Sequence, residues 1–154
     1  MASFSKESLW NHQGEDPMAL PQSWIAEAKA TGLFDAGAMT LSTLDPEGHP
    51  VSRVVSLLDF TATGVVFGTS DSSNKAQQIA KSPWVAGNLF WREPIRQINF
   101  QGAVTQLSDI ESDKLFAKRP RAGQAASVLG KQSTDLGDEA AFPAAVANLW
   151  AQVK

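Results

Sequence analysis

Residues 38–60 read AMTLSTLDPEGHPVSRVVSLLDF, and this stretch decides the fold class. Apolar residues alternate loosely with small polar ones over 38–44, and residues 50–60 are rich in β-branched side chains. Both patterns are typical of strands that bury one face. Between them, residues 45–48, DPEG, form a turn sequence. The stretch therefore predicts an antiparallel β-hairpin.

Similar patterns elsewhere predict further strands and several short helices. Strands are expected at 65–69, 84–91 and 95–107, and helices near 21–31, 75–81, 108–118, 122–129 and 139–153. Strands in hairpin order with short peripheral helices predict an antiparallel barrel in an α+β fold. Residues 1–16 are polar and irregular, so we expect a flexible N-terminal arm followed by one domain over 17–154.

The composition excludes several kinds of chemistry. The chain has 154 residues, no Cys, no Tyr and two His. It therefore offers no disulfide, no thiolate nucleophile and no phenolic acid or base, and we expect no metal site. The residues left for chemistry are Arg, Lys, Gln, Ser, Thr and the carboxylates, or else a bound cofactor.

The charge distribution favours a small anionic ligand. The net charge is −3, yet residues 61–131 hold nine Lys and Arg against five Asp and Glu. Nucleic-acid binding favours a broad basic face, which an acidic chain with a basic middle does not provide. The N-terminus lacks the apolar core of a signal peptide, and no apolar run approaches the ~18 residues of a membrane span. We therefore expect a soluble, cytoplasmic protein that binds neither nucleic acid nor membrane.

Three features carry the residues that indicate a binding site. Arg53 lies in a strand that otherwise reads as buried, and a desolvated guanidinium needs either a core carboxylate or an anionic ligand. Residues 68–76, GTSDSSNKA, place hydroxyls and an ammonium at a helix start, which caps the helix or cradles an anion. Residues 96–98, RQI, and 131–133, KQS, supply amides that can read the edge of a planar ring.

In order and spacing, residues 38–133 resemble the pyridoxamine 5′-phosphate oxidase family of FMN-binding split barrels. The resemblance is carried by SRVVSL (52–57), TGVVFGTS (63–70), SNKAQQI (73–79), RQINFQG (96–102) and KQS (131–133). It implies an antiparallel FMN-binding split β-barrel that forms a homodimer, with the FMN site at the interface.

Carried over residue by residue, the resemblance implies a cofactor site. Its members are Arg53, Val54, Val55, Ser56, Thr69, Ser73, Asn74, Lys75, Gln97, Gln132 and Ser133. Arg53 and Lys75 would hold the FMN phosphate, with the hydroxyl and amide of 73–74 in the same cradle. The backbone of 54–56 and Thr69 would line the flavin, and Gln97 would lie at the ring or ribityl region. The KQS segment would come from the partner subunit.

Departures from the family pattern concern the substrate. The enzyme that gives the family its name binds its substrate phosphate with a Lys, a Tyr, a Ser and an Arg. At the first three positions this chain has Leu58, Leu115 and Gly123, and the arginine is retained as Arg119. We therefore expect Leu58, Leu115 and Arg119 to bind a different substrate. The family's C-terminal segment, which contacts flavin and substrate, has no counterpart in the sequence.

TGVVFGTS and SPWVAGNLFWRE (82–93) are most similar to the flavin oxidases of phenazine biosynthesis. The resemblance implies an FMN-dependent oxidase that takes a hydride from a small aromatic or tricyclic substrate and is reoxidised by dioxygen. Arg119 or Arg121 would pair with the substrate carboxylate. The alternatives are pyridoxamine/pyridoxine 5′-phosphate oxidase, a non-catalytic flavin-binding protein, and a reductase that uses NADH or the deazaflavin F420. No catalytic acid or base is assigned.

Overall fold

The hairpin predicted over residues 38–60 is present as two strands, β1 (Ala38–Leu44) and β2 (Pro50–Thr61). They pair antiparallel, with Thr40 opposite Val54. Buried and exposed side chains alternate along both strands, as expected where one face of a sheet covers a core. The pattern in the sequence therefore predicted both strands.

The turn of this hairpin is organised by Asp45. Its carboxylate accepts hydrogen bonds from the backbone N–H of His49 at 2.8 Å and of Glu47 at 3.0 Å. The bond from His49 is the largest cause of a lowered Asp45 pKa. Gly48 adopts a φ of 87°, which a residue with a Cβ rarely does. The turn is thus defined by its own side chain and by one glycine.

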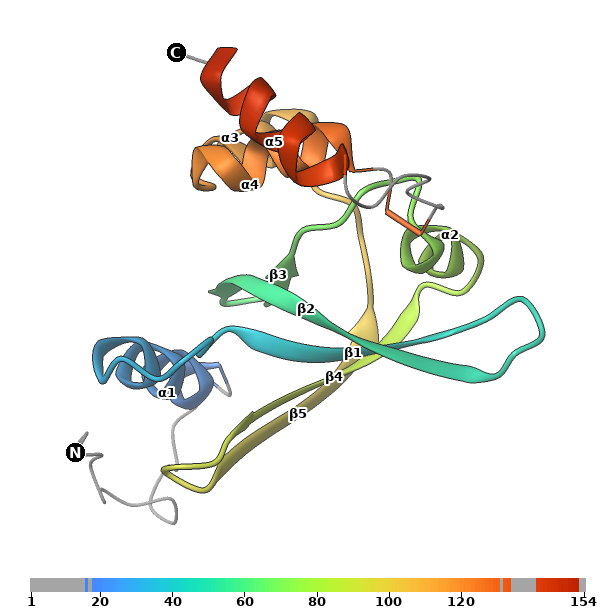
Figure 1. Cartoon of the computed structure of the whole chain (residues 1–154). Coiled ribbons are helices and arrows are strands. Elements are labelled where there is room, and N and C mark those ends of the chain that lie inside the picture. The colour runs from blue at the N-terminus through green and yellow to red at the C-terminus, as the bar shows by residue number, and fades with distance from the viewer. Residues whose placement is uncertain (1–15, 17, 131, 134–140, 153–154) are drawn as a thin grey trace. The chain divides into compact units, whose positions relative to one another are not determined.

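Three more strands complete the sheet: β3 (Gly64–Phe67), β4 (Trp84–Trp91) and β5 (Arg96–Ala103). The computed structural model describes residues 16, 18–130, 132–133 and 141–152 (Figure 1). In the described sheet the strand order is β3-β2-β1-β4-β5, and every neighbouring pair is antiparallel. The sheet is curled into a half-barrel, which confirms the antiparallel architecture predicted from the sequence.

The inner face of the sheet forms the main core. Its fully buried side chains include Met39, Leu41 and Leu89. Helix α1 (Ala19–Ala30) buries Ile25 and Ala28, two residues of the apolar stripe that predicted this helix. The core therefore lies between α1 and the inner face of the sheet. We call the opposite face of the sheet its outer face.

The described residues group into two compact units. The first comprises the chain up to Gly68 with Trp84–Ala103, and so contains α1 and the sheet. The second comprises Thr69–Pro83 and the chain from Val104 onward, and so contains the other helices. The prediction of one domain over 17–154 remains a prediction. Most of the predicted N-terminal arm lies outside the described residues.

The helices of the second unit are α2 (Asn74–Lys81), α3 (Asp109–Ala117), α4 (Arg121–Leu129) and α5 (Ala141–Gln152). Ser108 and Glu111 form the predicted capping box at the start of α3. Helices α4 and α5 pack against each other. Within the part of the chain that is described, no helix combines the length and the apolar character that crossing a membrane requires.

Candidate binding site

The segment before α2 is held in place by hydroxyl groups. Ser73 is the N-cap residue, and its fully buried Oγ accepts a hydrogen bond from the backbone N–H of Ala76 at 3.3 Å. The Thr69 and Ser73 hydroxyls lie 2.9 Å apart. The loop is therefore folded onto the first turn of the helix, and its hydroxyls converge at the helix N-terminus.

Lys75 and the KQS segment meet at this same point. The Lys75 Nζ donates to Thr69 Oγ1 at 3.2 Å and to Gln132 Oε1 at 2.9 Å. The backbone N–H of Asn74 donates to Ser133 Oγ at 3.1 Å. In Figure 1 a short orange segment lies beside α2, where these contacts are made. The structure thus brings together six predicted site residues of the second unit.

We call these six residues the anion cradle: Thr69, Ser73, Asn74, Lys75, Gln132 and Ser133. The sequence interpretation placed Gln132 and Ser133 on the partner subunit. In the structure they contact Lys75 and Asn74 of their own chain, because α4 ends at Leu129 and residues 132–133 lie at the start of α2. Their contribution to the site of a partner subunit stays a prediction.

The donors of the anion cradle fit a phosphate group. An ammonium, hydroxyls and the N-terminus of a helix are the groups that bind phosphate esters in proteins. Ser133 has a φ of 65°, a left-handed conformation that is unusual for a residue other than glycine. Such strain is typical of binding sites, where the surrounding contacts over-determine the backbone.

Arg53 lies on β2, in the first unit. Its Nη1 donates to Thr43 Oγ1 at 2.6 Å and to the backbone oxygen of Leu41 at 3.3 Å. Burial lowers the pKa of the guanidinium below its usual value, although an arginine this basic stays charged. Both of these acceptors are uncharged oxygens.

The residues after Arg53 alternate along β2. Val55 is buried, whereas the Val54 side chain is 65% exposed and Ser56 is also exposed. The pairing of β2 with β3 shifts by one residue between Leu57 and Asp59. Leu58, a predicted substrate residue, is therefore the extra residue of a β-bulge, a feature that often redirects side chains beside a site.

Gln97 lies on the outer face of β5 and belongs to a row of amides that the sequence interpretation missed. Its Nε2 donates to Asn99 Oδ1 at 3.3 Å, and Asn88 Nδ2 of β4 donates to the same oxygen at 2.6 Å. Asn88 and Asn99 are directly opposite in the antiparallel register. The register of the hairpin from β4 to β5 was the available signal, because it places all three side chains on one face.

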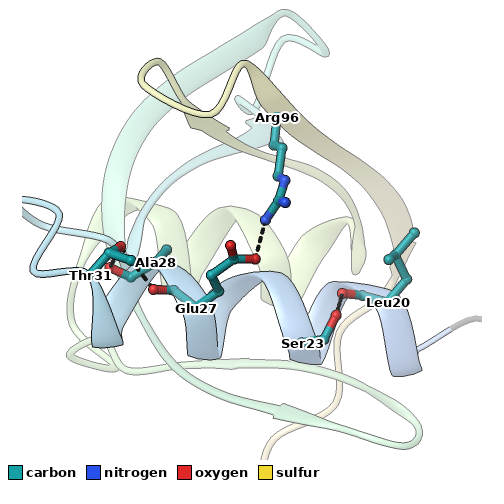
Figure 2. A network of polar contacts seen from close by, with 6 residues as sticks. All are labelled: Leu20, Ser23, Glu27, Ala28, Thr31 and Arg96. Carbon is teal, nitrogen blue, oxygen red and sulfur yellow. Dashed lines mark hydrogen bonds and ion pairs between the residues drawn. The ribbon is translucent and has the colours of Figure 1, made fainter. Parts of the chain in front are cut away.

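Arg96, the neighbour of Gln97, points to the opposite face of β5. It is only 7% exposed, forms an ion pair with Glu27 at 2.5 Å, and lies 5.1 Å from the ring centroid of Trp24. Figure 2 shows the guanidinium reaching Glu27 on α1. Arg96 therefore joins the sheet to α1, whereas Gln97 remains accessible to a ligand.

The other predicted substrate residues lie in the second unit. Leu115 is half-buried on α3. Arg119 follows the end of α3, and its Nη1 donates to Ser127 Oγ at 3.0 Å. A Cβ added at Gly123 would meet nothing within 4 Å. Among the described residues, no three or more His, Asp or Glu side chains gather as a metal site would require.

Comparisons with known proteins give these residues a context. A family model described as pyridoxamine 5′-phosphate oxidase matches residues 25–152. Dihydrophenazinedicarboxylate synthase of Pseudomonas chlororaphis is 34% identical over 123 residues, which are 80% of this chain and 55% of that protein. A pyridoxine/pyridoxamine 5′-phosphate oxidase of Rhodopseudomonas palustris (strain BisA53) is 38% identical over 138 residues, which are 90% of this chain and 65% of that protein.

Solved structures agree with these relatives. PhzG from Burkholderia lata, in complex with tetrahydrophenazine-1-carboxylic acid, has a TM-score of 0.86 and 30% identity, covering 95% of this chain and 74% of that one. A pyridoxamine 5′-phosphate oxidase-related, FMN-binding protein from Nostoc punctiforme shares the fold, with a TM-score of 0.65, 16% identity, and coverage of 82% of this chain and 71% of that one. The chain spans between 55% and 65% of the length of the two curated relatives named above. On the family match over residues 25–152, this chain belongs to the pyridoxamine 5′-phosphate oxidase family.

Proposed function

We propose that this protein binds FMN and that the anion cradle holds the phosphate of the cofactor. The observation that carries the proposal is the cradle itself, where Lys75 Nζ, the Thr69 hydroxyl and the start of α2 converge. A phosphate monoester accepts hydrogen bonds from all three kinds of donor, and its charge complements both the ammonium and the helix N-terminus.

Arg53 supplies a second cation in this proposal. Its guanidinium is half-buried and stays charged, so the charge of an anionic ligand complements it. The resemblance to the family assigns Arg53 to the same phosphate as Lys75. It also assigns the flavin to the backbone of residues 54–56 and to Gln97, which is exposed on its strand.

Titration with two flavins tests the phosphate assignment. FMN and riboflavin share a ring and a ribityl chain, so a difference in their affinities reports the phosphate. We expect FMN to bind at least about tenfold more tightly, because a hydrogen bond to a charged group contributes about 1.5–3 kcal/mol. Lys75→Ala should remove about tenfold of FMN affinity and leave riboflavin binding unchanged. Lys81→Ala, at the exposed far end of α2, is the matched control.

The outcomes of this titration are distinct. Equal affinities for FMN and riboflavin would refute the phosphate site while leaving a flavin site standing. A protein that binds neither flavin would refute the proposal as a whole. Arg53→Ala should behave like Lys75→Ala, and an unchanged FMN affinity in that variant would remove Arg53 from the site.

We further propose that the protein oxidises a reduced, carboxylated, polycyclic aromatic substrate. When bound, FMN supplies the redox chemistry, in which a hydride leaves the substrate and dioxygen is reduced to hydrogen peroxide. Apolar side chains at Leu58 and Leu115 suit a flat apolar substrate, and Arg119 or Arg121 suits its carboxylate. The likeness to PhzG, whose solved structure holds tetrahydrophenazine-1-carboxylic acid, supports this substrate class.

Pyridoxamine 5′-phosphate oxidation is the second candidate, favoured by the relative with 38% identity. Oxygen consumption with each substrate separates the two. We expect turnover of the reduced tricyclic acid, one hydrogen peroxide per substrate, and a higher KM in Arg119→Ala or Arg121→Ala. Turnover of pyridoxamine 5′-phosphate alone would establish the second candidate. Tight FMN binding without turnover of either substrate would indicate a non-catalytic flavin-binding protein. Oxidation of NADH or of reduced F420 would indicate a reductase.

We also propose that the outer face of the sheet pairs with a second copy of the chain. On β1, β4, β5 and the part of β2 before its bulge, this face carries no charged side chain, and it exposes Val54, Trp84 (60%) and Phe90 (58%). Interfaces are depleted of charge at their centre and enriched in aromatic residues, whereas a solvated sheet face carries charges. Analytical ultracentrifugation should show a dimer. Ala86→Lys places a charge on the outer face and should dissociate this dimer, whereas Ser112→Lys, at an exposed position of α3, should leave it intact. A monomeric wild-type protein would refute this pairing.

A further inference from the structure

Three amides on the outer face of β4 and β5 share one acceptor. Asn99 Oδ1 receives a hydrogen bond from Asn88 Nδ2 at 2.6 Å and another from Gln97 Nε2 at 3.3 Å. An amide oxygen has two lone pairs, so both are engaged. The carbonyl group of Asn99 is therefore held between two donors, one from each strand.

This arrangement determines which way the Gln97 amide faces. Its nitrogen points to Asn99, so its oxygen, Oε1, points away and remains free to act as an acceptor. The terminal torsion of a glutamine is broad and roughly two-fold, so an isolated amide presents oxygen and nitrogen almost equally. With Asn99 accepting from Asn88, the Gln97 amide gains a hydrogen bond to Asn99 only when its nitrogen faces that oxygen.

The strand beneath Gln97 is also fixed from the other side. Arg96 is buried on the inner face, where Glu27 and the ring of Trp24 hold its guanidinium. The backbone at this point of β5 is thus secured by an ion pair, while the amide row secures the side chain. Both components of a preorganised acceptor are present.

We propose that Asn99 is a positioning residue that makes Gln97 a hydrogen-bond acceptor, so that the site selects a ligand carrying an N–H group. This inference rests on the proposed binding of FMN, because the oxidised flavin ring has a single N–H, at N3, between two carbonyls. An outward amide nitrogen would face a carbonyl instead. The amide row therefore determines that Gln97 reads the donor of the ring edge.

The experiment compares FMN with 3-methyl-FMN, in which the ring N–H is replaced by a methyl group. We expect the wild-type protein to prefer FMN by about 3- to 10-fold, the range of one neutral hydrogen bond. Asn99→Leu should bring this ratio close to one. Asn99→Asp keeps the acceptor oxygens and should retain the preference. Gln101→Leu removes an exposed amide from the same face of β5 and is the matched control.

The ratio separates this inference from the proposed function. A wild-type protein that binds FMN and 3-methyl-FMN equally, or an Asn99→Leu variant that keeps the wild-type ratio, overturns the role of Asn99 alone. A wild-type protein that binds no flavin overturns both proposals. Thermal melting checks that each variant is folded. If Asn99→Leu is not, Asn88→Leu provides the same test, with a reduced preference expected and an unchanged one overturning the inference.

Discussion

Removing the carboxylate of Glu27 should destabilise the protein more than any exposed charge on the same helix. Glu27→Ala leaves the Arg96 guanidinium, 7% exposed, without its ion-pair partner over the ring of Trp24. Breaking a fully buried pair from one side costs about 3–5 kcal/mol. Because the Glu27 side chain is 21% exposed, we expect a smaller loss of about 2–3 kcal/mol.

Urea denaturation and thermal melting, followed by circular dichroism, measure this loss. For a chain of this size, 2–3 kcal/mol corresponds to a fall in Tm of about 4–12 °C. Lys29→Ala, exposed on the same helix, should change the stability by less than about 0.5 kcal/mol. Arg96→Met combined with Glu27→Ala removes the buried charge and should be more stable than Glu27→Ala alone. A double variant as unstable as the sum of the two single losses would refute the reasoning.

Three further predictions concern single positions. Gly87→Ala places a methyl group 2.1 Å from the ring of Phe100, so we expect urea denaturation to show a free energy of unfolding lower by about 1–3 kcal/mol. Gly102→Ala, whose methyl group meets no atom within 4 Å, should lower it far less. Ile95 is 81% exposed and has a φ of 52°, a conformation that costs about 1–2 kcal/mol for an L residue. Ile95→Gly should therefore raise the Tm, whereas Ile95→Ala, which keeps a Cβ, should not. Asp45 has a lowered pKa in the folded state, so its contribution to stability is present above its ordinary value of 3.8 and is lost as the pH falls through the folded pKa. The urea midpoints of wild type and Asp45→Asn should therefore converge as the solution is acidified, and a difference independent of pH would contradict this assignment.

Elements that bury one face were predictable from alternation alone. The predicted strands 38–44 and 84–91 coincide with β1 and β4, because each has a buried residue at every second position. The last strand was predicted to continue to residue 107, yet β5 ends at Ala103. Its partner β4 begins at Trp84, which is paired with Ala103. The Val104 N–H still donates to the backbone oxygen of Pro83 at 2.8 Å, but a proline has no N–H to donate in return, so the ladder ends there. Periodicity reports which face is buried and does not report where a neighbouring strand stops.

The candidate site was predictable where it depends on neighbours in sequence. The hydroxyls, the helix start and Lys75 lie within a few residues of one another, so their convergence follows from the start of α2. The ion pair of Arg96 with Glu27 joins residues 69 positions apart, and the row of amides depends on the register of β4 and β5. The ion pair leaves no local signal, and the row of amides is recognisable only from the register of the hairpin. The resemblance to the family identified Gln97 without indicating what holds its amide.

The bulge at Leu58 has a consequence for how freely this position can be substituted. Leu57 and Asp59 have partners in β3, and the residue between them is the extra one in the register. A side chain there can be exchanged without shifting the pairing of β2, because no partner residue on β3 constrains its size or charge. A substitution at position 58 is therefore expected to disturb the pairing of β2 with β3 little. If Leu58 contacts the substrate as proposed above, a substitution there can change the substrate preference while the hydrogen bonds of the sheet stay as they are.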